Sequence, residues 1–574
     1  MIKFFRKQSF LFSAIILAVG GILAKIIGAF YKIPLTNILG ANGMGVYYLI
    51  FPIYSLFLVI SSSGISIAVT KLIATERKLR NRENEIKIFN SGLIFSFGVS
   101  FILSLIILFF ARDISIMQGN ENAYLGYMVI APAIICASLI SILRAYFQGV
   151  ENFVPTSFST IVEQIVKLIF GLFLSIRFLN YGIEYAVVGA VLGVTISEFF
   201  AMVLLLINFY FYKKREKDYL ISNRSKNKSQ SVFLFYNPKV FKSKNLKKGK
   251  IEKGKWNENK KSLDLTKKQA FLKVLKYSLP ATLSSFVIPA TTFIDSFMVI
   301  NILVGSGFSS SMSTSLYGLT TGVVGSLISL PVLLVSSLST AIIPNLSGTY
   351  ASEEKRVVEE RVAFFIKITW LIALPLFAYF LIYSNEIVSV LFGGGLSFKG
   401  FDELAFASKL MMIGSVEIVY YAFLLTFIAI LQAINKPIIP MICLLIGLGF
   451  RTLLCLVLVN IPSINVFGIL ISNILFLSLT AIACLIAIKK YINFNISKKS
   501  FLIYPVLAVS VSVFVALSFK AILLNYMSKL AYSIISGGLG VLVYLLLILN
   551  FAVFTEKEIA LMPFPKKIFR RIES

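Results

Sequence analysis

The sequence predicts an all-α polytopic membrane protein with about fourteen transmembrane helices. Of its 574 residues, 57% are hydrophobic and only 14% are charged, whereas an average soluble domain has about 25% charged residues. The mean hydropathy is +0.87, and long apolar runs recur along the whole chain. A soluble chain of this length would form several domains and would need more polar surface than this composition supplies.

Fourteen segments are apolar and long enough to cross a bilayer as helices, which takes about 20 residues. Lys3, Arg6 and Lys7 precede the first segment as in a signal peptide. We keep it as a helix because it is long and no cleavage pattern follows it. The predicted spans are residues 8–33, 44–69, 89–111, 123–147, 155–178, 184–212, 272–303, 312–343, 362–384, 405–433, 438–459, 466–488, 501–521 and 530–554.

The basic residues between these spans fall mostly on one side of the membrane. With the N-terminus in the cytoplasm, the outer side receives only Arg112, Arg177, Lys399, Lys409, Lys520 and Lys529. Lys and Arg are enriched in the cytoplasmic loops of membrane proteins. The sequence therefore predicts a multi-pass protein of the cytoplasmic membrane with both termini in the cytoplasm.

One long polar insertion, residues 213–268, divides the spans into six and eight. It carries 19 basic and 5 acidic residues, and its Lys, Asn and Ser content favours disorder. We consider two roles, contact with anionic inner-leaflet lipids and a solvated tether. Nucleic-acid binding is not expected, because no folded module accompanies the charge. The predicted organisation is an N-lobe (1–212), this linker, a C-lobe (269–490) and a last pair of spans with a basic tail (491–574).

The two lobes carry similar sequence features, which predicts an internal repeat. Gln148 and Gln432 follow the fourth and tenth spans, and nineteen residues after each lies a basic residue, Lys167 or Arg451. Six spans is an even number, so both lobes have the same orientation, related by an axis along the membrane normal. We expect the substrate to bind between the lobes near the midplane.

Ionisable residues inside spans are costly and tend to face a cavity or a partner. Lys25 and Lys32 are seven residues apart, which places them on one helix face. They could form a cationic wall for an anionic head group, or Lys32 could reach the membrane interface. Arg144 suits either a phosphate contact or a simple interfacial anchor. With Lys167 and Arg451, these residues favour a cavity of cationic character.

Acidic residues also occur within the spans. Glu163 and Lys167 are spaced i, i+4, which suits a structural ion pair or a charge relay. Asp295 suits a coupling cation or a lysine across the cavity. Glu198 and Glu417 are further candidates for cation coupling.

The composition argues against catalysis and against a bound metal. The chain has no His, and its four cysteines lie in apolar stretches without CxxC spacing. It has no GxxxxGK[ST] loop, so ATP is not the expected direct driver. We expect no enzyme activity and no cofactor, with coupling to protons, to sodium or to the membrane potential.

Four stretches carry a family resemblance: GAFYKIPLTNILGANGMGVY at 28–47, FPIYSLFLVISSSGISIAVTKL at 51–72, EIVSVLFGGG at 386–395 and LQAINKPIIP at 431–440. Together with the fourteen spans and the linker, they resemble the stage V sporulation protein B family. That family is a branch of the MATE-like superfamily of multidrug, oligosaccharidyl-lipid and polysaccharide exporters, and is similar to the lipid II flippases.

The resemblance implies site residues. Lys25 matches a basic cavity position of family flippases, and Lys32 lies in the same stretch. Asp295 matches a sodium-binding aspartate of some members. The sequence departs from the family pattern at two places: residues 44–70 contain no basic residue, and Cys455 stands where an Asn or Asp is expected.

The resemblance implies a flippase that moves an undecaprenyl-pyrophosphate-linked sugar precursor by alternating access. The precursor would be lipid II-like or a polysaccharide unit, for cell-wall, spore-cortex or polysaccharide biosynthesis. Lys25, Lys32 and Arg451 would hold the pyrophosphate. The alternative is a cation-coupled multidrug exporter on the same fold, for which Asp295, Glu198 and Glu417 would matter more than the lysines.

Overall fold

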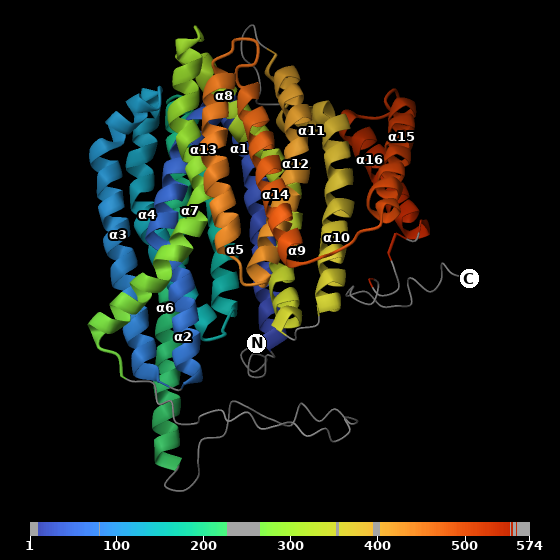
Figure 1. Cartoon of the computed structure of the whole chain (residues 1–574). Helices are drawn as coiled ribbons and strands as arrows, with labels where there is room; N and C mark the ends of the chain where they lie inside the picture. Colours follow the sequence, from blue (N-terminus) through green and yellow to red (C-terminus); the bar gives the residue numbers. More distant parts are fainter. Residues whose placement is uncertain are drawn as a thin grey trace.

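The structure is a computed structural model that describes residues 10–79, 81–226, 264–351, 355–393, 402–551, 553, 554 and 558. Long helices dominate this part of the chain (Figure 1). They are α1 (Phe10–Leu58), α2 (Gly64–Lys78), α3 (Arg82–Met117), α4 (Tyr124–Gly149), α5 (Val154–Leu179), α6 (Ile183–Lys226), α7 (Lys267–Gly305), α8 (Ser310–Tyr317), α9 (Gly325–Ala351), α10 (Lys355–Ile382), α11 (Ser384–Phe392), α12 (Glu403–Ala433), α13 (Ile438–Val459), α14 (Phe467–Tyr491), α15 (Tyr504–Leu523) and α16 (Lys529–Asn550).

Three helical runs of the described chain contain a π-helical turn, one of them at Lys499–Ile503 directly before α15. Residues Val59–Ser63 join α1 to α2, and residues Gly318–Val324 join α8 to α9. Most of the expected linker, the first nine residues and most of the basic tail lie outside the described residues.

Thirteen helical runs among the described residues are long and apolar enough to cross a membrane. The first run, Gly20–Arg77, contains two of the expected spans. The division between them is at Gly40, where the backbone leaves helical geometry (φ 65°, ψ −174°). A positive φ costs glycine little, since it has no Cβ. The thirteen runs therefore correspond to the fourteen predicted spans.

Side-chain contacts confirm that the chain reverses near Gly40. Before the turn, Gly20 contacts Ser157 at the start of α5, and just after it Gly43 contacts Ile183 at the start of α6. The chain then returns beside α4, so that its later residue Ile73 contacts Gly149 at the end of that helix. We call the end of the bundle with the α4–α5 turn the N-terminal face, and the other end the opposite face.

The helices form two lobes with a helical pair at one side. The first span through α6 form the N-lobe, α7–α14 form the C-lobe, and α15 and α16 pack on each other and on α10 (Figure 1). At the lobe boundary α7 packs along α2 and α3. This is the predicted architecture of two six-span lobes and two further helices.

The repeat predicted from Gln148 and Gln432 has a matching backbone structure. Three residues after each glutamine, Glu151 and Asn435 both adopt a φ of 60°. Each donates its backbone N–H to the carbonyl of that glutamine, at 3.0 and 3.2 Å. The α4–α5 and α12–α13 turns thus end their helices in the same left-handed geometry.

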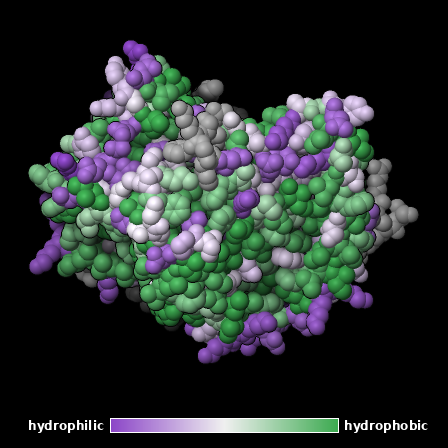
Figure 2. All heavy atoms as spheres, turned by 90° about the horizontal axis from the view of Figure 1, so that it is seen from above, coloured by the Kyte–Doolittle hydropathy of each residue, from purple (hydrophilic) through white to green (hydrophobic). Residues whose placement is uncertain are grey.

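The outer surface of the bundle is strongly apolar. Large hydrophobic side chains are exposed on several spans, among them Ile94, Phe109, Phe173, Ile446 and Phe514. In the end-on view of Figure 2, broad hydrophobic areas separate the polar patches. Side chains of this kind suit contact with lipid, as a multi-pass membrane protein requires.

Candidate functional site

The first group of buried charges lies in the N-lobe, between α4 and α5. The Arg144 guanidinium donates to Glu163 Oε2 at 2.8 Å and to Ser159 Oγ at 3.0 Å. The Gln164 side chain donates to the other Glu163 oxygen at 2.9 Å. The sequence suggested that Glu163 pairs with Lys167, but the ion pair in the structure joins it to Arg144 on the neighbouring helix.

Two lysines of the N-lobe lie over aromatic rings. The Lys167 ammonium is 5.3 Å from the ring centre of Tyr31 and 5.7 Å from that of Phe51. The Lys32 ammonium is 5.6 Å from the ring centre of Tyr48. Such cation–π contacts stabilise an ammonium while leaving its N–H groups free to donate.

The side of the N-lobe that holds these lysines faces the C-lobe. Lys25 is exposed and donates to Ser336 Oγ of α9 at 3.3 Å. The hydroxyl of Tyr48 lies 2.8 Å from Ser326 Oγ, also on α9. Lys25 and Lys32 therefore both belong to the stretch of α1 that meets the other lobe.

Glu198 of α6 completes the N-lobe group. Its side chain is buried, and its Oε1 accepts a hydrogen bond from the Tyr54 hydroxyl at 3.0 Å. Among the described residues no lysine or arginine lies within 4.0 Å of its carboxylate.

The second group of buried charges lies in the C-lobe. Arg451 of α13 donates to both carboxylate oxygens of Asp295 of α7, and to Asn473 Oδ1 of α14 at 2.9 Å. The Arg451 side chain is only 1% exposed. The Glu417 carboxylate is also buried nearby, and its Oε1 has no hydrogen-bond partner in the described part of the chain. Arg451 and Asp295, expected to bind a head group and a cation, therefore neutralise each other here.

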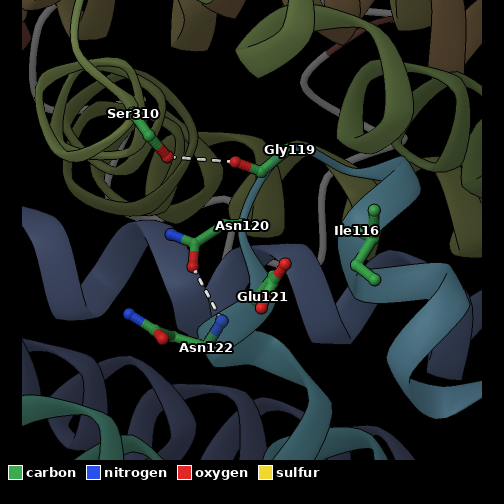
Figure 3. Close-up of a pocket in the computed structure, with 6 residues that line it drawn as sticks. All are labelled: Ile116, Gly119, Asn120, Glu121, Asn122 and Ser310. Carbon is green, nitrogen blue, oxygen red and sulfur yellow. Dashed lines mark hydrogen bonds between the residues drawn. The ribbon is translucent and has the colours of Figure 1, made fainter.

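The lobes are in contact at the opposite face. Asn42 donates to Ser311 Oγ at 2.8 Å, and Gly45 and Gly318 lie where an added Cβ would collide with backbone of the other lobe. Beside this contact is a polar recess of about 390 Å³. Figure 3 shows Ser310 donating to the Gly119 carbonyl, at 3.0 Å, across the lobe boundary.

The lobes are also joined at the N-terminal face. Lys273 of α7 pairs with the buried Glu76 of α2 at 3.2 Å. Asn84 donates to the same carboxylate at 3.1 Å, and its Oδ1 accepts the backbone N–H of Leu265, near the end of the linker, at 2.8 Å. A glycine, Gly64, again allows the close approach of α2 to α7.

The buried ion pair of Lys367 is among those that the sequence did not predict. Lys367 of α10 is buried, and its ammonium contacts Glu558 at 2.7 Å and the Val553 carbonyl at 3.0 Å. A lysine inside an apolar span was a signal that could have identified Lys367. No pattern pointed to Glu558.

Within the part of the chain that the structure describes, no three His, Cys, Asp or Glu side chains converge as a metal site requires. The ionisable groups instead form pairs within and between the lobes. Such an arrangement can bind a charged solute and change its contacts as the lobes move.

Comparison with known proteins agrees with the expected resemblance. Residues 10–240 match the family described as "Polysaccharide biosynthesis protein". The chain is 25% identical to stage V sporulation protein B of Bacillus subtilis (strain 168), over 97% of this chain and 98% of that protein. It is 24% identical to the lipid II flippase MurJ of the same strain, over 78% of this chain and 76% of that protein.

Solved structures share the fold. The chain superimposes on lipid II flippase MurJ in an inward closed conformation with a TM-score of 0.66 and 16% identity, covering 94% of this chain and 99% of that one. A multidrug resistance MATE family transporter in an inward-facing conformation gives 0.59 and 14% identity, covering 81% and 96%.

Proposed function

We propose, from the premise that this chain is a relative of stage V sporulation protein B and the lipid II flippases, that it is itself a flippase. Its substrate would be a polyprenyl-pyrophosphate-linked sugar, either lipid II-like or a polysaccharide unit. The lobes would expose the site to each side of the membrane in turn. The relatives are named as flippases, transporters or sporulation proteins, which supports transport rather than catalysis.

The pair Lys32 and Lys167 carries the proposal. Both ammonium groups rest on aromatic rings, and among the described residues no carboxylate lies within 4.0 Å of either. A pyrophosphate offers several anionic oxygens to such donors. Arg144 is paired with Glu163 and Arg451 with Asp295, so we assign the first contact to the lysines and a supporting role to the arginines.

In alternating access, the contacts between the lobes break at one face while those at the other face remain. The Lys273–Glu76 pair would open for entry, and the Asn42–Ser311 contact would open for release. We place both termini in the cytoplasm, which makes the N-terminal face the entry side. The linker, residues 213–268, would lie against anionic lipids there. The membrane potential can contribute about 2.3 kcal/mol per charge per 100 mV.

Lipid II exposure at the outer leaflet tests the function, in cells depleted of their own flippase and expressing this chain. We expect the wild type to restore exposure, and Lys32→Ala with Lys167→Ala, or Lys25→Ala with Lys32→Ala, to lose it. Lys436→Ala is the matched control, because Lys436 also lies over a tyrosine ring, that of Tyr491 at 5.1 Å, but outside the N-lobe.

The outcomes separate the candidate functions. If all variants reach the membrane at equal levels and Lys436→Ala alone retains exposure, the cationic site is supported. If the wild type is well expressed and exposure stays absent, lipid II is not its substrate. Drug efflux that depends on Glu198 and Glu417 but not on the lysines would instead support the multidrug exporter.

A further inference from the structure

Glu198 is a buried carboxylate that no described cation neutralises by direct contact. It is 8% exposed, and its Oε1 accepts a hydrogen bond from the Tyr54 hydroxyl at 3.0 Å. By contrast, Asp295 is paired with Arg451, and Glu163 with Arg144. A hydroxyl can donate to a carboxylate and equally to the carbonyl oxygen of a neutral acid. The contact with Tyr54 therefore accommodates Glu198 with or without a proton.

The titratable groups around Glu198 come from every helix that packs on α6. From α5 they are Glu163 and Lys167; from α4, Arg144 and Cys136; and from α1, Tyr54. Lys32 is linked to this group only through Lys167, because the two ammonium charges repel each other. The two lysines proposed to bind the pyrophosphate thus belong to one electrostatic cluster with Glu198.

An anion entering this cluster changes its balance of charge. Without the anion, the Arg144 guanidinium and the Lys167 ammonium favour a charged Glu198, whereas its burial and the Glu163 carboxylate favour the neutral acid. Once the pyrophosphate oxygens neutralise that ammonium, a charged Glu198 faces added negative charge in a site of low dielectric constant. A buried charge without a partner is strongly unfavourable. Taking up a proton removes that penalty.

We propose that Glu198 is a proton-binding site whose occupancy is linked to anion binding at Lys32 and Lys167. The carboxylate takes a proton from water as the anion binds, giving a neutral carboxylic acid, and returns it to water when the anion leaves. Linkage is reciprocal, so a proton on Glu198 also tightens anion binding. The inference rests on the proposed function and adds to it a proton that moves with the substrate.

Proton uptake on binding tests the linkage directly. The full chain in detergent and weak buffer is titrated with farnesyl pyrophosphate while a dye reports the pH. We expect the wild type to take up protons and Glu198→Gln to lose the uptake while still binding the probe. Protons exchanged by the probe itself are the same for both proteins and cancel in the difference.

Glu417→Gln is the matched control, because Glu417 is equally buried, at 8% exposed, but lies in the other lobe. It should keep the uptake. In the wild type, affinity should fall as the pH rises, and Glu198→Gln should flatten that dependence. Equal uptake by wild type and Glu198→Gln, or a loss of uptake in Glu417→Gln alone, would overturn the proposal.

A measurement on the wild type covers the case in which Glu198→Gln does not fold. Infrared difference spectra with and without farnesyl pyrophosphate should show a new protonated-carboxyl band, and its absence would overturn the proposal. A wild type that does not bind the probe refutes the proposed substrate class, and the linkage with it. Binding without Glu198-dependent uptake refutes only the linkage.

Discussion

The Arg451 guanidinium and the Asp295 carboxylate form a two-pronged ion pair between α13 and α7, although 156 positions separate them in the chain. Both side chains are almost completely buried. Pairing lowers the free-energy cost of burying the two charges, because together they are neutral. It also joins the first span of the C-lobe to the fifth.

Removing one partner of this pair should destabilise the protein strongly. Asp295→Asn or Arg451→Gln should each lower the free energy of unfolding by about 3–5 kcal/mol, because the remaining charge is buried alone. The double variant should lose less than the sum of the two single losses. Thermal unfolding in detergent measures this, and strict additivity would show that the pair is not coupled.

Alanine at the inter-lobe glycines should open the opposite face. A Cβ at Gly45 would collide with the Thr314 carbonyl, and one at Gly318 with the Ala41 carbonyl. Overpacking costs about 1–3 kcal/mol. If the cost falls on the closed state, the equilibrium constant between closed and open forms of this face changes by roughly 5- to 150-fold toward the open form. Disulfide formation between Asn42→Cys and Ser311→Cys should fall accordingly.

Gly21→Ala is the control for the glycine variants, since its Cβ would meet nothing within 4 Å. Crosslinking should stay at the wild-type level in that variant. Undiminished crosslinking in both Gly45→Ala and Gly318→Ala would mean that the lobes tolerate the added methyl groups.

The packing of the C-terminal segment against α10 should depend on the ion pair between Lys367 and Glu558. Glu558→Gln leaves the buried Lys367 ammonium with the Val553 carbonyl and no carboxylate. We expect a loss of about 3–5 kcal/mol, as for other buried pairs broken on one side. Adding Lys367→Met should recover part of it. Thermal unfolding and proteolysis of the tail measure the effect.

Arg356→Gln serves as the comparison for the C-terminal pair, because Arg356 pairs with Glu360 while 85% exposed. Exposed pairs contribute about 0–1 kcal/mol. If Glu558→Gln is as mild as Arg356→Gln, the tail contact does not stabilise the fold.

The lobe contact at the N-terminal face should weaken when Lys273 is changed. Lys273→Gln removes the cation from the buried Glu76 carboxylate, at a cost of about 1–3 kcal/mol, between the exposed and buried limits. A cysteine placed at the buried Ser278 should then react faster with a water-soluble maleimide. Lys87→Gln, which breaks an exposed pair with Glu83 at 3.6 Å, should leave that reactivity unchanged.

Most of the fold could be predicted from the sequence because membrane insertion depends on local apolar length. All fourteen spans were found in this way, and the two that form one helical run are separated at Gly40, within the short connection left between residues 33 and 44. The π-helical turns at Val59–Ser63 and Gly318–Val324 had no such local signal.

The partners of the charged residues could not be predicted in the same way. Spacing on a single helix favoured Glu163 with Lys167, but Arg144 is the partner because α4 lies beside α5. The sequence marked Asp295 as a cation or lysine site, and the structure supplies an arginine from a distant helix. Periodicity describes one helix at a time, whereas these pairs are fixed by how helices are arranged around each other.

The matching turns after Gln148 and Gln432 have an evolutionary consequence. Two halves with the same orientation and the same helix-ending geometry are what duplication and fusion of one ancestral gene would produce. Lys167 and Arg451 then occupy equivalent positions in the two copies. One copy keeps an amine over aromatic rings, and the other holds its guanidinium in an ion pair. The two equivalent residues therefore have different roles. Lys167 is suited to binding and releasing a ligand, and Arg451 stabilises the C-lobe.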